Sequence, residues 1–570
     1  MRARVVGTAV ALALALGPPA ASAWAGAWGA PMDLGPVAGP PGFPAAYTGA
    51  VAMDASGTAV VAWATADKMV AAVRPPGGAF GAPQVLGPDP GSNARVALDG
   101  SGRALVVWNS GGSVQAAERA PGSTFARLAP VASAARSAPA DVAFLADGTA
   151  IVGYRGGDRL PHVAVRAPGG TFVSSTLSTV ADLLGGPVRV AAAGGYAIAA
   201  WGDGQMVGFT TRRHTTKAMV SVLMPGGGFG TPVELMTTTY DGFDLSARTQ
   251  VVGMAPRIAP SGAADVAVSS VFDTGPVPLD VVCSTDTLET RAPGPAGSWT
   301  TGAGDGSASC TPDPPRAMDL ATGPRDDGLL VLGRGLDEPR IAVTSKVRAV
   351  GAATYAPGPD VFVGPATPRA QVPVSVAPLS DGRYVVLFLR DDDVRAVAGE
   401  PALAFEPSVL VAAHQGITAL LGAASSGSEA VAAWTSWTVV RSSTRTSGAA
   451  LRVALYDDRA TPTVRLSEVA MTRRRFIRST TIRWRSSVPA TLTFRVVRLN
   501  GSHERSIGSF VRSVEADMGS LRFHGVVHRH RLRPGRYRLS VVASAPAMAA
   551  SAPASVTFTV RQDVRPRRAR

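Results

Sequence analysis

Residues 93–131 read NARVALDGSGRALVVWNSGGSVQAAERAPGSTFARLAPV, and the rest of the chain repeats their pattern. Four apolar runs are separated by short groups of turn residues, of which Asp99 to Gly102 is the clearest. Apolar runs of this length, bounded by Gly, Asp, Ser and Pro, are typical of β-strands joined by tight turns. The stretch therefore predicts four consecutive antiparallel strands.

A turn glycine marks each copy of this pattern, at intervals of 45 to 47 residues through the first four copies. Eight such positions follow one another: Gly57, Gly102, Gly148, Gly195, Gly262, Gly328, Gly382 and Gly427. An aromatic residue opens the fourth strand in seven copies: Phe80, Phe125, Phe172, Phe229, Trp299, Tyr355 and Phe405. A recurring four-strand unit of this length is typical of a β-propeller blade. We predict an all-β propeller with eight blades, or seven if the weak copy near Gly328 is misread.

The eighth copy, which starts at Ile417, stops after its third strand. Its missing strand has a counterpart near the N-terminus, where WGAPMDLGP (28–36) matches FGAPQVLGP (80–88) almost residue for residue. Pairing this strand with the last blade would close the ring and cover an edge that is otherwise open to other chains. We predict that the N-terminal strand closes the propeller.

The second strands, such as AVVAW and ALVVW, are apolar on both faces, as a sheet packed between two neighbours requires. An aromatic residue stands six residues after the turn glycine in five copies: Trp63, Trp108, Tyr154, Trp201 and Phe388. A row that stacks on carbohydrate is one interpretation. Because the position is the same in each blade, we predict core packing. The Asp-containing turns lack the alternating ligands of a calcium loop.

The first residues are typical of an exported protein. Arg2 and Arg4 precede the apolar run VVGTAVALALALG, and residues 21–23 form a small-residue cleavage sequence, so we predict a signal peptide over 1–23. The expected mature chain is secreted or surface-associated and has no transmembrane segment. Cys283 and Cys310 are the only cysteines, and we predict that they form a disulfide. A metal or thiol site is the alternative.

The fourth and fifth copies are longer, with turn glycines 67 and 66 residues apart. We expect the extra residues to form long loops on one face of the ring, because antiparallel strands place both kinds of lengthened connection there. Long loops on a rigid scaffold commonly carry binding sites. The residues predicted to bind a polar or anionic ligand are Arg212, Arg213, His214, Tyr240, Asp241 and Asp244. Solvated loops without a ligand are the alternative.

The repeat pattern ends at Asp458, so we assign residues 24–458 to the propeller, 459–562 to a basic β-sandwich and 563–570 to a basic tail. Strand-like runs recur in the second segment, spaced by turns such as Asn500–Gly501. The sequence LRPGRYRL (532–539) resembles the approach to a late strand in bacterial immunoglobulin-like and fibronectin-like modules. The resemblance implies an immunoglobulin-like fold and a spacer or adhesive role for the last fifth of a secreted propeller repeat protein.

The charge is unevenly distributed. Residues 461–570 contain 22 Arg and 5 Asp or Glu, a net charge of +17, whereas the whole chain carries +14. This asymmetry favours attraction to an anionic cell-envelope polymer or polysaccharide, and a solvated arginine-rich strand face is the alternative. The residues predicted to bind such a polyanion are Arg473, Arg474, Arg475, Arg529, Arg531 and Arg533.

Other partners are less well supported by the residues. The chain has no RNA-binding signature and no helix-turn-helix pattern, so we predict no specific nucleic-acid partner. His528 and His530 alternate onto one strand face, but the neighbouring arginines would repel a cation. We therefore predict no metal and no cofactor.

The motifs of common enzymes are missing: no nucleophile elbow, zinc-ligand spacing, dinucleotide loop or P-loop is found. Adjacent aspartates exist, but nothing selects an acid and a base among them. We predict a secreted, non-enzymatic binding or surface-interaction protein, with the propeller as ligand platform and the basic sandwich as tether. The alternative is a secreted carbohydrate-active or lyase-type propeller enzyme.

Overall fold

The computed structural model describes residues 26–37, 49–134, 139–181, 186–207, 212–242, 248–273, 282–294, 297–301, 305–311, 317–335, 340–352, 354–365, 372–391, 393–401, 404–406, 408–413, 419–439, 446–460, 463–501, 503–515, 517–546 and 548–561. Every regular element among them is a β-strand. In these ranges, no helix is long and apolar enough to span a membrane. The predicted signal peptide and basic tail lie outside the described residues.

Eight antiparallel sheets of four or five strands follow one another between Ala27 and Asp457 in the part of the chain that is described. Sheets 1 to 4 are β3 (Gly49–Met53), β4 (Ala59–Ala64), β5 (Met69–Arg74), β6 (Gln84–Gly87); β7 (Ser92–Leu98), β8 (Ala104–Ser110), β9 (Ser113–Arg119), β10 (Ala126–Arg127), β11 (Ala132–Ser133); β12 (Asp141–Phe144), β13 (Ala150–Arg155), β14 (Pro161–Arg166), β15 (Val173–Thr176); and β16 (Val188–Ala193), β17 (Tyr196–Val207), β18 (Arg212–Leu223), β19 (Val233–Gly242). Sheets 5 to 8 are β20 (Arg248–Ile258), β21 (Ala264–Asp273), β22 (Val282–Arg291), β23 (Trp299–Thr301), β24 (Asp305–Thr311); β25 (Ala317–Thr322), β26 (Gly328–Gly335), β27 (Arg340–Arg348), β28 (Ala356–Pro357), β29 (Phe362–Pro365); β30 (Val374–Pro378), β31 (Tyr384–Arg390), β32 (Asp393–Glu400), β33 (Ala404–Phe405), β34 (Val409–Ala412); and β35 (Ala419–Ser426), β36 (Glu429–Val439), β37 (Thr446–Asp457) with β1 (Ala27–Trp28) and β2 (Met32–Pro36).

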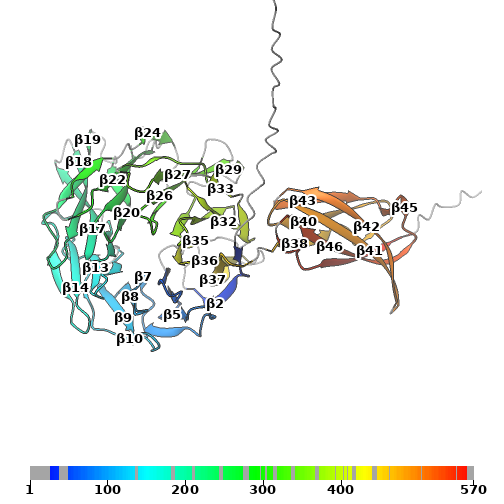
Figure 1. The fold of residues 1–570 in the computed structure, drawn as a ribbon, viewed down its shortest axis with the longest axis horizontal. Helices are drawn as coiled ribbons and strands as arrows, with labels where there is room; N and C mark the ends of the chain where they lie inside the picture. The colour runs from blue at the N-terminus through cyan, green and yellow to red at the C-terminus, as the bar shows by residue number, and fades with distance from the viewer. Residues whose placement is uncertain are drawn as a thin grey trace, which may run out of the picture.

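The sheets form a closed, propeller-like ring, coloured in turn from blue through green to yellow (Figure 1). The first strand of each sheet contacts the first strand of the next, and β35 contacts β3 to complete the circle. The N-terminal strands β1 and β2 pair with β37, Trp28 opposite Tyr456 and Met32 opposite Val453. The predicted closure of the ring by the N-terminal strand is confirmed.

The second strands form the buried layer of each sheet, and β4 has no exposed residue. The aromatic column at their ends is also buried: Trp63 and Trp108 are 1% exposed and Trp201 is fully buried. These rings pack between neighbouring sheets. The prediction that they belong to the core, and do not stack on carbohydrate, is confirmed.

Tight turns join the first and second strands, and most adopt the conformation that requires glycine. Gly57, Gly102 and Gly148 have φ of 91°, 84° and 82°, a region that a side chain disfavours. In sheet 6 the corresponding positive φ of 65° belongs to Asp326, and Gly328 already lies in β26. The assignment of Gly328 as a turn residue was wrong, because aspartate can take the left-handed conformation itself. The sheet it was meant to mark is nonetheless present.

These turns share one face of the ring with the connections between third and fourth strands, and we call it the turn face. At the end of β5, Arg74 donates from Nε to Gly78 O at 2.9 Å and from Nη1 to Gly57 O at 3.1 Å. One guanidinium thus closes both turns of its sheet. The same position at the end of the third strand holds Arg119, Arg166, Arg291 and Arg348.

Two of these arginines, Arg74 and Arg166, also join neighbouring sheets. Arg74 pairs with Glu429 of sheet 8 at 2.7 Å, and Arg166 binds both carboxylate oxygens of Glu118 in sheet 2 at 2.8 and 2.9 Å. Bidentate pairs of this kind combine charge with fixed geometry. They add charged contacts between sheets to the packing of apolar side chains.

A carboxyl group near the closure of the ring provides a pH test. Burial raises the pKa of Glu406 to about 7, with Asp458 acting in the same direction and Arg383 in the opposite one. Between pH 4.5 and 7 the folded protein therefore holds a proton that the unfolded chain has released, so the free energy of unfolding falls as pH rises through this window. We expect Glu406→Gln to raise the unfolding temperature by ~2 °C at pH 8, after discounting for partial solvent exposure, and to change it little at pH 4.5. Thermal unfolding across this range measures the difference, and an equal effect at both pH values would contradict the assignment.

The extra residues of sheets 4 and 5 lengthen strands. The hairpin of β17 and β18 pairs from Ala197 with Leu223 as far as Val207 with Arg213. In sheet 5, β21 pairs with β22 over its whole length, from Ala264 to Asp273. The expectation of long loops was therefore wrong for most of the added residues, since these residues lie in paired strands. The face to which these hairpins extend carries the connections after second and fourth strands, and we call it the loop face.

Residues 463–561 form a separate unit of two facing sheets, the C-terminal module. One sheet has the order β38 (Leu466–Met471), β40 (Thr480–Ser486), β43 (Asp517–Phe523); the other has the order β39 (Arg475–Phe476), β47 (Ala554–Val560), β46 (Gly535–Ser544), β41 (Ala490–Asn500), β42 (His503–Val514); β44 (Val526–Val527) pairs with β45 (His530–Arg531). Between the sheets, Trp484 meets Phe494 edge to face at 5.7 Å. Tyr537 is buried and donates its hydroxyl hydrogen bond to Arg533 O at 2.6 Å.

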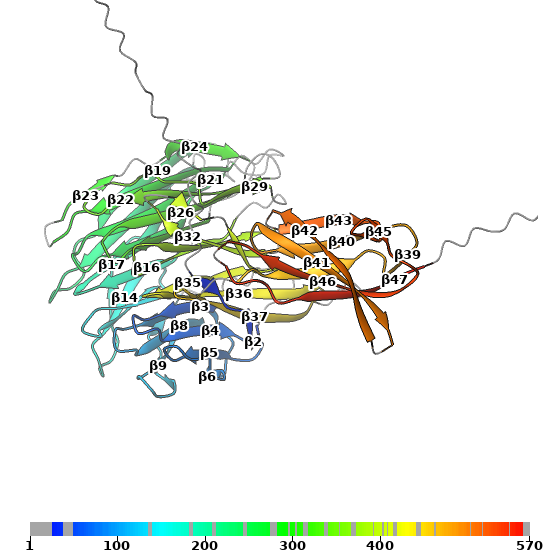
Figure 2. The same cartoon turned by 45° about the vertical axis from the view of Figure 1, so that its right-hand side comes forward.

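The module sits against the rim of the ring beside sheets 7 and 8 (Figure 2). One hydrophobic cluster runs across the junction and includes Trp28, Val411 and Val464. Arg485 of β40 makes an ion pair with Asp393 of β32, and both side chains are buried. The junction is therefore packed and charge-paired.

Candidate functional site

The first strand of each sheet borders the axis of the ring. At one equivalent position of this strand, the residue is polar in five sheets. These residues are Arg95, Asp141, Arg189, Asp319 and Ser375. Asp141 accepts a hydrogen bond from Val190 N at 3.1 Å, and Asp319 accepts one from Val376 N at 3.0 Å. Each carboxylate thus satisfies an amide on the free inner edge of the next sheet, which is a structural role.

Arg95 and Arg189 give this region a positive charge. Arg95 Nε lies 3.9 Å from Asp141 Oδ1, and the structure gives Arg189 no ion pair among the described residues. Burial and the charge of Arg189 lower the pKa of Arg95 to about 10, while Asp141 acts in the opposite direction. Arg189 thus adds a positive charge beside the Arg95–Asp141 pair, an arrangement that attracts an anionic group.

The carboxylates at the axis have structural partners. Within the described ranges, no group of three or more His, Cys, Asp or Glu side chains could hold a metal ion. Asp141 and Asp319 are occupied by backbone amides, and Asp319 Oδ1 also lies 3.4 Å from Arg257 Nη2. The axis offers positive charge and small apolar residues.

The predicted ligand patch falls on β18 and β19. Register places Arg213 opposite Asp241 and His214 opposite Tyr240, with Arg212 opposite Gly242. Five of the six predicted residues therefore occupy paired register positions at the loop-face end of sheet 4. Asp244 lies outside the described residues. Ligand binding at this patch stays a prediction.

Cys283 and Cys310 face each other directly in the register of β22 and β24. Directly opposed residues in antiparallel strands have Cα atoms about 4.5 or 5.5 Å apart. A disulfide needs Cα atoms about 4.4–6.8 Å apart, so this backbone register is compatible with one. The structure places the two cysteines in paired strands.

The six arginines predicted to bind a polyanion are exposed. Arg473 and Arg474 precede β39 and Arg475 begins it. Arg529 lies in the turn of the β44–β45 hairpin, Arg531 ends β45 and Arg533 follows it. Arg531 Nη2 donates to Ile477 O at 3.3 Å, which brings the two segments together. Neither segment, 472–478 or 524–533, contains an acidic residue. The two segments form one surface, which we call the basic end of the module.

The histidines of the basic end are exposed. His528 Nε2 lies 3.2 Å from Ser509 N and accepts its hydrogen bond, which joins the hairpin to β42. His528 and Arg529 both take positive φ, 49° and 65°, at the tip of the hairpin. The alternation of His528 and His530 on one strand face therefore does not apply, because the turn lies between them.

Sheet 3 contains an acid–histidine pair that the sequence analysis did not identify. His162 Nε2 is 3.1 Å from Asp158, and Nδ1 is 3.3 Å from Thr176 Oγ1. The order resembles that of a catalytic triad. However, Tyr154, His162 and Thr176 are direct cross-strand neighbours on β13, β14 and β15, and Tyr154 stacks on His162 at 5.2 Å. Strand pairing alone accounts for these contacts.

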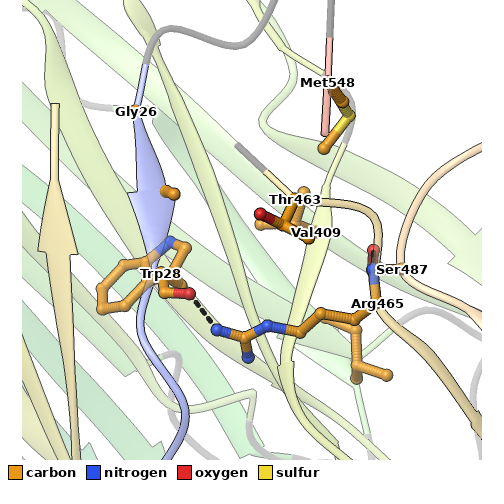
Figure 3. Close-up of a pocket in the computed structure, with 9 residues that line it drawn as sticks. Gly26, Trp28, Val409, Thr463, Arg465, Ser487 and Met548 are labelled. Carbon is orange, nitrogen blue, oxygen red and sulfur yellow. Dashed lines mark hydrogen bonds between the residues drawn. The ribbon is translucent and has the colours of Figure 1, made fainter. Parts of the chain in front are cut away.

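A small cavity lies at the junction of ring and module (Figure 3). Its volume is about 30 Å³, which is room for one or two water molecules. Arg465 crosses it and donates to Trp28 O and to Val411 O, the latter at 3.0 Å. The cavity is a gap in a packed junction that this arginine bridges, and it is too small for an organic ligand.

Comparison with known proteins finds similar solved structures at low sequence identity. No protein-family model and no curated protein matches the sequence. Similar solved structures include a fungal alcohol oxidase of the AA5 family in complex with copper (11% identity, covering 94% of this chain and 100% of that chain, TM-score 0.37). A PL25 ulvan lyase (11%, 66% and 96%, 0.36) and the fucose-specific lectin from Aleuria aurantia (12%, 63% and 93%, 0.32) are also similar. Because the TM-scores are below 0.5, these similarities do not indicate a function for this chain.

Proposed function

We propose that this chain is an exported, non-enzymatic binding protein that uses an eight-bladed propeller as ligand platform and a basic immunoglobulin-like sandwich as tether to an anionic envelope polymer or polysaccharide. The basic end of the module is the observation that carries this proposal. Its six arginines are exposed, lie on two adjoining segments and have no acidic residue in those segments.

The architecture supports both parts of the proposal. The eight sheets and their closed circle of first strands favour eight blades. The hydrogen bond from Tyr537 to the backbone four residues upstream is similar to the tyrosine corner of immunoglobulin-like sandwiches. On the ring, the carboxylates at the axis bind backbone amides, which favours binding over acid–base catalysis.

Export and the disulfide belong to the same proposal. The residues that support export are Arg2, Arg4 and the apolar run that follows them. An oxidising compartment permits the Cys283–Cys310 bond, and the register of β22 with β24 supports it. This bond would cross-link the third and outer strands of sheet 5.

The tether is tested with a charge-matched pair of variants of the chain from Trp24 onward. Replacing Arg529, Arg531 and Arg533 by Gln is expected to weaken binding to heparin on the order of 100-fold, because each arginine near an anionic surface contributes roughly 1 kcal/mol. The dependence of binding on salt should weaken as well. The control replaces Arg483, Arg495 and Arg522, three exposed arginines on strands of the same module.

The measurement is affinity for heparin and for polygalacturonate between 50 and 500 mM salt. Binding that falls equally in both triple variants would show that overall charge, and not the basic end, attracts the polymer. A wild-type chain that fails to bind either polymer at 50 mM salt would contradict the tether.

A further inference from the structure

We propose that a pocket on the loop face of sheet 2 is a binding site for a neutral, polyhydroxylated ligand of mono- or disaccharide size. This inference rests on the proposed role of the ring as ligand platform and names the ligand class. Three connecting segments form the pocket: the segment between β6 and β7, the turn between β8 and β9, and the segment after β11. Its lining residues are Pro90, Gly91, Ser92, Asn109, Ser110, Gly111, Gly112, Ser113 and Ala134.

The volume of the pocket is about 430 Å³. Pockets for small ligands typically measure about 300–1,000 Å³. The space therefore suits one sugar ring or two, and it is more than ten times larger than the cavity at the junction with the module.

The walls of the pocket are held in place by hydrogen bonds. Ala134 N donates to Gly112 O at 2.9 Å, which ties the outer connection to the β8–β9 turn. Ser113 Oγ donates to Ser110 O at 3.0 Å across the same turn, and Gln115 Nε2 donates to Ser113 Oγ at 2.6 Å. A site whose shape exists before binding loses less conformational entropy when the ligand enters.

Three of the lining residues are glycines that the backbone requires. A Cβ on Gly91 would lie 2.4 Å from Trp108 Cδ1, so no side chain fits there. Gly111 and Gly112 have open space around them but take φ of 60° and 78°, so conformation and not space requires glycine in the turn. Because glycine has no side chain, none shields the peptide groups of these three residues, of which Gly112 O already accepts from Ala134 N.

The chemistry of the lining selects the ligand class. Among the nine lining residues no side chain is charged or aromatic, and the polar groups are three serine hydroxyls, the Asn109 amide and the peptide groups of the glycines. An ionised ligand would leave water for a site with no counter-charge, which is costly. Hydroxyl and amide groups both donate and accept, as sugar hydroxyls do. The neutral pocket thus differs from the positive axis and the basic end.

The test uses the chain from Trp24 onward and a panel of methyl glycosides of glucose, galactose, mannose, fucose and N-acetylglucosamine. The methyl glycoside of galacturonic acid, with its carboxylate ionised, is the charged comparison ligand. Saturation-transfer NMR and calorimetry report binding. Ser110→Trp fills the pocket from the end of β8. Ser123→Trp is the matched control, since Ser123 is exposed on the turn face of the same sheet.

We expect at least one neutral glycoside to bind, Ser110→Trp to weaken that binding at least tenfold, and Ser123→Trp to leave it unchanged. Three results would overturn the proposal: no neutral glycoside binds the folded wild type, the galacturonate binds as tightly as the neutral sugars, or Ser110→Trp has no effect. Heparin affinity measured on the same samples should be equal in all three proteins. A loss of heparin binding therefore reports on the tether, and a loss of sugar binding reports on the pocket.

Discussion

Deletion of residues 26–37 is expected to abolish cooperative unfolding of the ring. These residues include β1 and β2, and they bury Trp28 and Val37 with Met32 and Leu34 packed beside them. Burial of each such side chain contributes roughly 1.5–3 kcal/mol. The summed loss is of the same size as the whole stability of a typical protein, about 5–15 kcal/mol. The deletion also removes Pro36 O, the acceptor at 3.0 Å for the indole N–H of Trp63.

The exposed edge of β37 should then pair with other chains, so we expect soluble aggregates. Thermal unfolding followed by circular dichroism, together with size-exclusion chromatography, measures both effects. A synthetic peptide of residues 26–37 added in excess should restore a monomer by strand addition, whereas the same peptide with Trp28→Asp and Leu34→Asp should not. Cooperative unfolding of the truncated chain within ~2 °C of the intact one would show that closure contributes little.

The closure could be predicted because a strand copied in sequence keeps its position in the repeat. The nine residues from Trp28 match those from Phe80, so their place at the outer edge of a sheet followed directly. The prediction of a turn at Gly328 was wrong because glycine does not mark this position in every copy. Glycine is only one residue that takes positive φ, and in sheet 6 Asp326 does so.

The lengths of sheets 4 and 5 show a second limit. Spacing between turn glycines gives the number of extra residues but not their conformation. The added segments are rich in threonine, as in TTRRHTTK and MTTTYDG, and threonine favours strands. That composition was the available signal for the long β17–β18 hairpin.

An arginine recurs at the end of the third strand, and the sequence alone does not reveal its role. Arg74, Arg119, Arg166 and Arg291 each precede a Pro-Gly turn by one or two residues. Their role depends on two turns that lie far apart in sequence and together on one face. The pocket of sheet 2 has no such signal in the sequence, since glycine and serine in turns have no distinctive pattern until three connections meet in space.

The buried charge cluster between sheets 5 and 6 should show a large and non-additive loss of stability. Asp265 Oδ2 accepts from Arg348 Nη2 and from the Tyr355 hydroxyl, each at 3.0 Å, and all three residues are at most 6% exposed. Burial raises the pKa of Asp265, and Arg348 acts in the opposite direction. Asp265→Leu leaves the Arg348 guanidinium buried without its main counter-ion, which costs about 3–5 kcal/mol.

Removing both charges should cost less than removing one. In Asp265→Leu/Arg348→Met the apolar side chains fill the space and no unpaired charge remains, so we expect a smaller loss than in either single variant. Tyr355→Phe removes one neutral donor and should cost about 1 kcal/mol. Denaturant titrations of the four variants give these free energies and the coupling energy of the pair.

The exposed pair of Lys217 and Glu234 provides the control. Its side chains are 44% and 42% exposed at an N–O distance of 2.5 Å, and Glu234→Gln should cost at most about 1 kcal/mol because solvent screens the pair. Strictly additive single losses at Asp265 and Arg348 would show that the two residues act independently. A coupling energy well above that of the exposed pair would instead establish that the contact between sheets 5 and 6 depends on a buried ion pair, and that the ring is held by charge as well as by apolar packing.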